Sequence, residues 1–496
     1  MKEPSIITVP NEKLSKVTSK VTSFGQDSND LKIQIKKMVR VLRQEGGIGL
    51  AANQLGYENQ VLVIEFKEAN QKHSKKSSKT KTEIPLTIFI NPEIVEYGKT
   101  NECFEEGCLS VPKIELEAER PTKIKIKYQD TYGKRIKTAP KGLLARILQH
   151  EIDHLNGILF TERVKEQFFQ KYPEFKKLKI AFFGSGEFGA TILEGLILLE
   201  LNLDIYTEES KPAGRDRETR PTAVAQVARK FGKKYTEISN IAEGMPLSEW
   251  RSSPPAGGRV GWIGSPNANG ATRGDNYDLF ICSDFGQKIP ISILKQAKIA
   301  ALNIHPSLLP KYIGPTPIQT AILNGDKKTG ASIIQMTDKI DQGPLYSQIE
   351  TEILKNDTSP LLRDRLATLG LKLLVKTLPK IVHEEIEAVE QDLSKAIRTR
   401  KFTKADGEID WTKNPKKIDA QIRAFDTWPG SYTFVDNKRL IIHKAHIKNS
   451  KLVLDIVQSE GKKPMKFSEF LRGYHGPKPD WLEKISLTSD NISSKI

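Results

Sequence analysis

The sequence has few cysteines, no long apolar run and no apolar leader, and each absence excludes a class of protein. Three cysteines, Cys103, Cys108 and Cys282, cannot build a disulfide framework, so we expect reduced thiols or ligands and a cytoplasmic location. The most apolar stretch, Ile192–Ile205, is interrupted by four polar residues, and the N-terminus has no run long enough for a signal peptide. We therefore expect no membrane partner.

Size and charge indicate several domains and an anionic partner. A chain of 496 residues is longer than one hydrophobic core usually organises, and 38% apolar with 28% charged residues excludes a chain disordered throughout. The net charge of +16 favours a partner such as nucleic acid. Half of this surplus lies in Lys395–Lys451, with 14 basic and 6 acidic residues. That segment predicts a polyanionic substrate, with a solvated basic surface as the alternative.

The first third of the chain has the pattern of an α+β domain. Helical periodicity covers Leu31–Glu45 and Gly142–Leu155. β-rich runs lie between the two helices, at Gln60–Phe66, Thr87–Tyr97 and Thr122–Asp130. Strands that precede a helix instead of alternating with helices are typical of α+β folds. Residues 67–83 are rich in lysine and serine, and we interpret them as a solvated loop, with a contact to ribosomal RNA as the alternative.

The second part begins near Leu178 with the strand, glycine turn, helix and strand of a βαβ unit. Apolar runs at Tyr277–Ser283 and Ile299–Ile304 extend a parallel sheet, so we expect an α/β Rossmann-like domain, which the helix Leu361–Val382 closes. Residues 244–276 are dense in glycine, proline, serine and arginine and predict a disordered surface insertion. The later β-rich runs predict a small OB-like β-barrel. The expected divisions are domains at 1–165, 178–390 and 391–485, a linker at 166–177 and a tail at 486–496.

A histidine motif on the predicted helix Gly142–Leu155 indicates a metal site. His150 and His154 are four residues apart and share a helix face, with Glu151 beside them. A cation held by both imidazoles lowers the pKa of a bound water toward about 7, and a neighbouring carboxylate can take and return the proton. The motif favours metal-assisted hydrolysis; two exposed histidines on an amphipathic helix are the alternative.

Two other segments supply what such a site needs. Cys108 lies in a turn between strands, and a thiolate with two imidazoles leaves one tetrahedral position open for water. Small residues in Gly47–Gln54 let the backbone approach a ligand, and Gln54 offers an amide donor to a tetrahedral oxyanion. In another context Cys108 would be an ordinary buried thiol. The ligand types alone do not choose iron over zinc.

Taken in order, the segments GIGLAANQ, EGCLS and HEIDH resemble peptide deformylase. The resemblance implies an Fe²⁺ site that also works with Zn²⁺, Ni²⁺ or Co²⁺, with the ligands Cys108, His150 and His154. The implied substrate is the formyl group on the N-terminal methionine of a nascent polypeptide, and the ribosome is a candidate partner.

The same resemblance assigns roles around that site. It makes Glu151 the general acid/base and gives the oxyanion to Gln54 and the backbone N–H of Leu109. It also places Gly49 and Arg120 against the peptide.

A glycine-rich segment, Gly184–Gly189, follows the first strand of the second domain, and Asp204 comes twenty residues after Gly184. This spacing matches a dinucleotide fingerprint, in which pyrophosphate binds a helix N-terminus and the carboxylate binds a ribose hydroxyl. Many α/β domains, however, use glycines there only for a tight turn and close packing. An NAD site stays an alternative, and the chain would then be a metalloprotease-like hydrolase fused to an NAD-dependent oxidoreductase.

Asn303 and His305 alternate at the end of a predicted strand, so both side chains project to one side of the edge where open α/β sheets bind ligands. Asp341 follows in a later loop. An asparagine, a histidine and an aspartate without a serine or cysteine nucleophile suit a reaction in which a substrate supplies the nucleophile. Group transfer to an amine fits this set.

This part of the chain resembles the folate-dependent formyltransferases, and within them the methionyl-tRNA formyltransferases, over roughly Leu178–Leu482. The resembling segments are KIAFFGSGEF, KPAGR, NIHPSLLP, AILNGDKKTGASI, DQGPL, DGEIDW, IRAFDTWPG and KPMKFSEFLRGY. The resemblance implies 10-formyltetrahydrofolate as donor and the α-amine of initiator methionyl-tRNA as acceptor, with no role for DNA.

Residue roles follow from the same resemblance. Asn303 and His305 would stabilise the oxyanion and help proton transfer, while Asp341 orients His305 and favours its protonated form. The implied folate pocket contains Ser307, Leu308, Leu309 and Pro310. The basic loop with Lys211 and Arg215, together with the third domain, would hold the tRNA.

One position departs from the family pattern. The segment Lys311-Tyr312-Ile313-Gly314 has isoleucine where the family usually has arginine, so one positive charge near the site is missing. We predict a bifunctional chain that formylates methionyl-tRNA and deformylates the polypeptide after translation has begun. Besides the hydrolase–oxidoreductase fusion, the alternative is an RNA- or ribosome-binding protein with vestigial sites.

Overall fold

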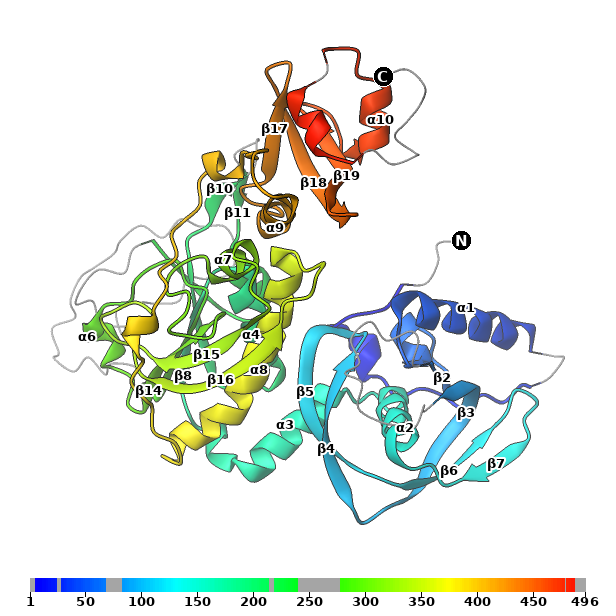
Figure 1. Cartoon of the computed structure of the whole chain (residues 1–496). Helices are drawn as coiled ribbons and strands as arrows, with labels where there is room; N and C mark the ends of the chain where they lie inside the picture. The colour runs from blue at the N-terminus through cyan, green and yellow to red at the C-terminus, as the bar shows by residue number, and fades with distance from the viewer. Residues whose placement is uncertain are drawn as a thin grey trace. The chain divides into compact units, whose positions relative to one another are not determined.

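The computed structural model describes residues 5–24, 28–67, 83–213, 218–239, 277–477 and 479–486, with backbone only at 211–213 and 218. The predicted insertion at 244–276 and most of the predicted lysine-rich loop lie outside these ranges. The chain divides into two compact units, one mainly of residues up to 178 and one mainly of residues from 179 onward (Figure 1). None of the helices in the described ranges is long and apolar enough to cross a membrane.

The first unit is built on a five-stranded sheet with the order β1-β2-β3-β6-β7 and antiparallel pairing. The strands are β1 (Gly49–Ala51), β2 (Val61–Phe66), β3 (Ile84–Tyr97), β6 (Ile124–Gln129) and β7 (Arg135–Thr138). The central strand β2 is buried along its whole length. Helix α1 (Asn29–Glu45) turns Leu31, Ile35, Met38 and Leu42 into the same core, as its periodicity predicts.

A separate two-stranded hairpin, β4 (Asn101–Cys108) and β5 (Val111–Pro121), was not anticipated from the sequence. Helix α2 (Gly142–Leu155) contacts β5 as well as β2 and β3, and in Figure 1 it lies between the hairpin and the sheet. This packing brings the end of β4 to the middle of α2. The α+β architecture expected for the first domain is therefore present, with the hairpin as an addition.

The expected linker at 166–177 has helical structure. Helix α3 spans Phe160–Lys171, packs on β5, and is followed by the 3-10 helix Pro173–Lys176. Its buried residues Phe160, Val164 and Phe168 follow a spacing of four, which the charged residues between them obscure in the sequence.

The second unit contains a seven-stranded sheet with the order β12-β9-β8-β13-β14-β15-β16. These are β8 (Ile180–Gly184), β9 (Leu203–Glu208), β12 (Thr236–Ile238), β13 (Leu279–Ser283), β14 (Ala300–His305), β15 (Lys328–Gln335) and β16 (Leu345–Glu352). The first five in sheet order are parallel, whereas β15 and β16 add antiparallel strands. The sheet is thus Rossmann-like and mixed, instead of purely parallel. Its helices are α4 (Glu187–Leu198), α5 (Ala223–Lys230), α6 (Ile291–Leu294), α7 (Pro317–Leu323) and α8 (Ser359–Val382).

The last part of the chain forms a four-stranded antiparallel sheet with its own core. The strands are β17 (Ser431–Val435), β18 (Lys438–Lys448), β19 (Lys451–Ser459) and β20 (Met465–Lys466). Helices α9 (Pro415–Ala424) and α10 (Phe467–Arg472) accompany them, and Phe467 and Trp481 fill the core. The expected β-barrel is not confirmed, because the strands in the described ranges form an open sheet in the order β17-β18-β19-β20.

Residues 391–400, expected to open the third domain, pack on the second domain. Backbone hydrogen bonds join Ile313 to Ile397 and Thr399, at 2.8 Å each, and the side chain of Gln391 donates to the carbonyls of Asp341 and Gly343. This segment therefore belongs to the surroundings of the predicted transferase site.

Candidate functional sites

Cys108, His150 and His154 come together although β4 and α2 are distant in sequence. Each offers one ligand atom, and these atoms all lie within 4.8 Å of one another. The Cys108 sulfur is 3.2 Å from Nε2 of His154. A thiolate and two imidazoles at this separation fit a divalent transition-metal ion and leave a further position open. The residues present thus suit the metal that the sequence motif implies.

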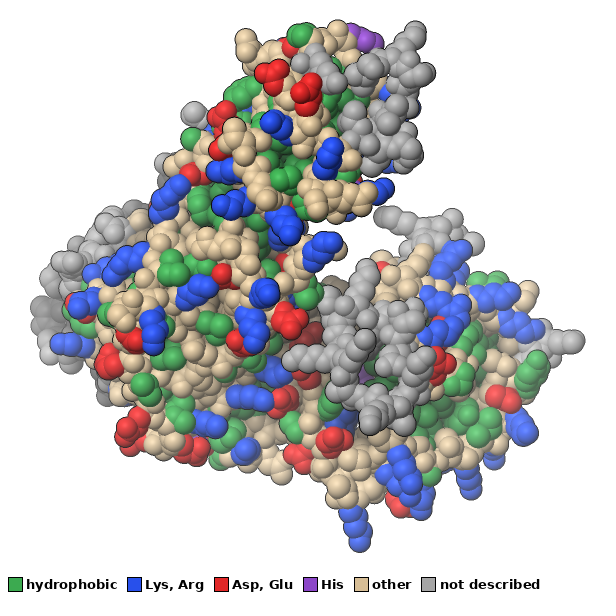
Figure 2. Space-filling model, viewed as in Figure 1, with side chains coloured by type: hydrophobic (Ala, Val, Ile, Leu, Met, Phe, Trp, Pro, Cys, Tyr) green, Lys and Arg blue, Asp and Glu red, His purple; other side chains and the backbone are tan. Residues whose placement is uncertain are grey.

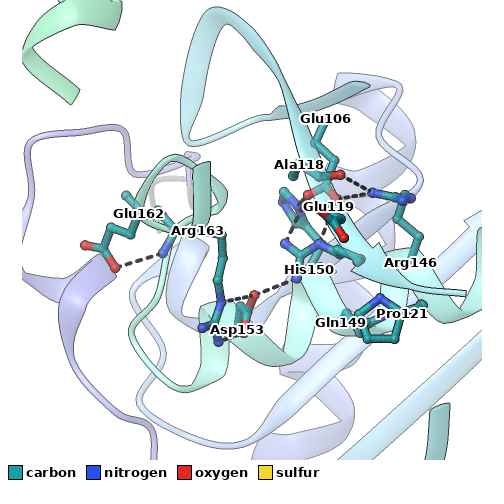
Figure 3. Close-up of polar contacts among 12 residues, drawn as sticks. Glu106, Ala118, Glu119, Pro121, Arg146, Gln149, His150, Asp153, Glu162 and Arg163 are labelled. Carbon is teal, nitrogen blue, oxygen red and sulfur yellow. Dashed lines mark hydrogen bonds and ion pairs between the residues drawn. The ribbon is translucent and has the colours of Figure 1, made fainter. Parts of the chain in front are cut away.

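Glu106 orients one of the two imidazoles. Its Oε2 is 3.0 Å from Nδ1 of His150, so Nε2 of that ring is left for an ion (Figure 3). The same carboxylate accepts hydrogen bonds from Arg120 and Arg146. Burial works to raise the pKa of Glu106, but the hydrogen bonds from His150 and Arg120 prevail and lower it to about 2. The carboxylate is therefore charged at neutral pH.

Arg120 is not placed to hold a peptide, which corrects the sequence-based expectation. Only 5% of it is exposed, and its guanidinium is shared between Glu106 and Asp153, with Nη1 2.7 Å from Asp153 Oδ2. Asp153 also accepts from Arg163 on α3 (Figure 3). Arg120 therefore links β5 to α2 behind the metal ligands.

Glu151 points into a space that Gly49 leaves free. A Cβ atom at position 49 would lie 2.4 Å from Oε1 of Glu151, so any larger residue would displace the carboxylate. Glu151 is 4% exposed, and its Oε2 has no hydrogen-bond partner among the described residues. Burial raises the pKa of this carboxyl. Gly49, expected to contact the peptide, thus has a clear structural role toward Glu151.

Gln54 lies beside the sulfur ligand. Its Oε1 accepts the backbone N–H of Ala51, which turns Nε2 toward Cys108 Sγ at 3.6 Å and Ser110 Oγ at 3.2 Å. Leu109 is in the turn directly after Cys108. Although burial alone would raise it, the two imidazoles hold the pKa of the Cys108 thiol well below its usual value. One predicted oxyanion donor, Gln54 Nε2, therefore lies beside the Cys108 sulfur.

The second predicted residue set lines a cavity of about 840 Å³ in the other unit. Asn303 and His305 on β14 and Asp341 in the loop before β16 all contribute to its wall. Asn303 Nδ2 donates to Asp341 Oδ1 at 3.1 Å, and the same oxygen is 3.6 Å from Nδ1 of His305. Volumes of about 300–1,000 Å³ are typical of small-molecule sites.

The contact that orients His305 differs from the one expected. Its Nε2 lies 2.9 Å from the backbone carbonyl of Tyr312, which can only accept, so Nε2 carries the proton. Nδ1 therefore faces Asp341, beyond direct hydrogen-bond distance. The closer contacts of Asp341 are Asn303 and the backbone N–H of Gly314 at 2.9 Å.

Two residues of the implied folate segment, Ser307 and Leu309, are buried, whereas Leu308 and Pro310 are half-buried. None of Ser307, Leu308, Leu309 and Pro310 is among the residues that line the cavity. Ser307 is fully buried and donates to the carbonyl of Lys311, and the Leu309 amide donates to Ser332. The cavity's lining includes a loop after β13, at 284–289, together with Met336 and Ile340. The role of the four residues in binding folate stays a prediction.

The glycine-rich turn before α4 is filled by protein. The backbone carbonyl of Asp284 accepts the N–H groups of Ser185 and Gly186, and its carboxylate accepts that of Phe188. A Cβ at Gly186 would lie within van der Waals radii of this carboxylate. A pyrophosphate would meet a negative charge where it needs amides, and Asp204 is bound to Tyr277 instead of being free for a ribose. The NAD alternative is therefore not favoured.

Two predicted tRNA contacts cannot be placed. Lys211 begins the short strand β10 (Lys211–Ala213), which pairs with β11 (Glu218–Arg220). The structure describes the backbone of Lys211 but not its side chain. Arg215 lies outside the described residues.

Comparison with known proteins finds three family models along the chain. Family models match at residues 4–169 (polypeptide deformylase), 178–378 (formyl transferase) and 401–452 (formyl transferase, C-terminal domain). A methionyl-tRNA formyltransferase of Staphylococcus aureus strain MW2 is 33% identical over 269 residues, 54% of this chain and 79% of the relative. The chain belongs to the methionyl-tRNA formyltransferase family and carries a polypeptide deformylase domain ahead of it.

Another formyltransferase and two solved structures are also similar to this chain. The formyltransferase of S. aureus strain JH1 has the same identity and coverage. Among solved structures, a class I type b peptide deformylase of Acinetobacter baumannii is 31% identical and covers 32% of this chain and 96% of its own, with a TM-score of 0.29. A peptide deformylase of Synechococcus elongatus is 33% identical and covers 33% of this chain and 79% of its own, with a TM-score of 0.28.

Sequence reasoning missed the residues that hold the ligands. Glu106 is two residues before Cys108, and this spacing on a strand was the only local signal that both could face α2. Asp153 follows His150 by three residues on one helix, which is a similar signal. The partners Arg120 and Arg146 gave none, because their contacts depend on the register of β4 with β5.

Proposed function

We propose that this chain is a bifunctional enzyme of translation initiation, which formylates methionyl-tRNA and removes the formyl group from N-formylmethionine of new polypeptides. The observation that carries the proposal is the presence of two separate residue sets, each gathered within its own unit. The two activities need not cancel. One acts on an amino acid esterified to tRNA, whereas the other acts on a peptide.

For deformylation, we propose Cys108, His150 and His154 as ligands of Fe²⁺ or a similar divalent ion. When bound, such an ion lowers the pKa of a water molecule and polarises a carbonyl oxygen. One carboxylate oxygen of Glu151 has no hydrogen-bond partner among the described residues, and with it Glu151 can take a proton from water and return it to the leaving amine. Gln54 Nε2 and the Leu109 amide are the proposed donors to the oxyanion.

For formyl transfer, the proposed donor is 10-formyltetrahydrofolate, which would occupy the cavity beside β14. Asn303 uses one amide hydrogen to bind Asp341, so its second N–H is available to stabilise an oxyanion. His305 can accept and return a proton at Nδ1, because Nε2–H already donates a hydrogen bond to the Tyr312 carbonyl. The nucleophile is the amine of the acceptor, which explains why this cavity needs no serine or cysteine nucleophile.

The proposed partners are initiator methionyl-tRNA and the formylated nascent polypeptide, with the ribosome as a further candidate and the cytoplasm as the location. The net charge of +16 supports a polyanionic substrate. Lysine and arginine side chains are spread over the face in Figure 2, so the charge does not single out one RNA-binding patch. Two assembled sites argue against an RNA-binding protein with vestigial sites.

The test is a paired assay on the full chain. Glu151→Gln should abolish deformylation of a formyl-Met peptide and leave formylation of methionyl-tRNA unchanged, and His305→Gln should do the reverse. Loss of both activities from either substitution would contradict two independent sites. Metal analysis of the purified wild type should give about one divalent ion per chain, and a chain without metal would support the vestigial alternative.

A further inference from the structure

The isoleucine at position 313 occupies a central place in the transferase cavity. Its neighbour Tyr312 holds His305 through the backbone carbonyl, and its other neighbour Gly314 holds Asp341 through the backbone N–H. Ile313 itself is 3% exposed and packs against Leu309. No positive charge therefore comes from this position.

Arg398 stands directly opposite Ile313. The two residues form a parallel β-bridge, fixed by the bonds from the Ile313 N–H to Ile397 and from the Thr399 N–H to Ile313. Side chains of bridged residues lie on the same face of the pair, and both Ile313 and Arg398 line the cavity. A cation thus reaches this wall from the segment that connects to the C-terminal domain.

Hydrogen bonds and close packing hold the backbone of the Ile313–Arg398 bridge in place. Thr399 Oγ1 accepts the N–H of Thr316 and lies 3.1 Å from the carbonyl of Ile313, to which it donates. A Cβ at Gly314 would meet Thr399 at 2.9–3.0 Å, so the two backbones approach closely. The base of the Arg398 side chain is therefore held in register with the residues that orient His305 and Asp341.

The guanidinium of Arg398 has no hydrogen-bond or ion-pair partner among the described residues. The side chain is exposed, and no ion pair or side-chain hydrogen bond within the described part of the chain involves it. Its neighbour Arg400, by contrast, is paired with Asp406. Lys339 and Lys401 also line the cavity, and its acidic lining residues are Asp284, Asp338 and Asp341.

We infer that Arg398 binds an anionic oxygen group of a transferase substrate at the mouth of the cavity. A guanidinium binds a carboxylate or a phosphate through two parallel hydrogen bonds. The group is a glutamyl carboxylate of the folate donor or a phosphate of the tRNA acceptor end. This inference rests on the proposed transferase function.

The experiment compares Arg398→Gln, Arg398→Lys and the control Lys355→Gln in the full chain. Lys355 is an exposed lysine outside the basic segment and does not line the cavity, so its replacement removes an equal charge. Losing a charge-assisted bond at an exposed site should raise one substrate's KM about tenfold in Arg398→Gln. The lysine variant should recover part of that loss, while kcat and deformylation stay near wild type.

The two sources of the anion give different results. If a donor carboxylate is bound, the KM for 10-formyltetrahydrofolate rises and that for methionyl-tRNA does not. If a tRNA phosphate is bound, the KM for methionyl-tRNA rises and its log–log dependence on salt becomes shallower by about one. Equal KM values for Arg398→Gln and Lys355→Gln would overturn the inference. An inactive wild-type transferase would instead refute the proposed function.

Discussion

Replacing Glu106 with glutamine should weaken both the first unit and its metal site. The carboxylate is 5% exposed and accepts bonds from Arg120, Arg146 and His150 at 2.7–3.0 Å. A glutamine has one acceptor oxygen, so its NH₂ group must face one of these donors. Breaking a buried ion pair costs about 3–5 kcal/mol, and the lower end applies here because Asp153 still binds Arg120.

The assay has two readouts on the full chain. A loss of about 3 kcal/mol in a unit of this size should lower its melting temperature by about 10 °C in calorimetry. Chelator competition should show metal affinity reduced about 10–100-fold, since the ring of His150 loses its partner. Glu105→Gln is the matched control, because Glu105 is adjacent and exposed. Formyl transfer should be unaffected. If Glu106→Gln binds metal and melts like the control, the proposed support of His150 is wrong.

The same substitution has a pH signature. The pKa of Glu106 is lowered from 4.5 to about 2, so its contribution to stability is complete above pH 4.5 and is lost as the pH falls toward 2. The stability difference between wild type and Glu106→Gln should therefore narrow over this interval. A difference that stays constant down to pH 2 would show that the carboxylate is not held in its charged form.

Two further substitutions and one treatment test the two proposed sites separately. Gly49→Ala should reduce deformylation about 100-fold in a kinetic assay, because its Cβ would lie 2.4 Å from Glu151 Oε1, and wild-type activity would refute that clash. Removing divalent metal with a chelator should abolish deformylation and leave formyl transfer intact; loss of both would indicate one shared centre. Gln391→Ala removes two bonds to the loop of Asp341 and should lower kcat of formyl transfer about fivefold, whereas an unchanged kcat would show that the loop holds its shape unaided.

Local patterns predicted the elements that carry the chemistry. Helix α2 has the predicted bounds, and the strand with Asn303 and His305 ends one residue beyond the predicted end. Both follow from periodicity, since residues four apart share a helix face and alternate residues share a strand face. Helix α3 escaped notice because its few apolar residues are separated by charged ones. The burial of Ser307 and Leu309 could not be predicted, since it depends on contacts with Lys311 and Ser332.

The amino-acid sequence by itself determined the number of catalytic residue sets, their order along the chain and the ligand types, because each motif is short and its spacing alone places side chains on a common face. Only the tertiary structure decided which residues support them. Glu106 reaches His150, Asp284 fills the glycine turn, and Arg398 faces Ile313 through contacts between segments 40–100 residues apart. Such contacts depend on strand register and packing, for which a single sequence has no periodic signal.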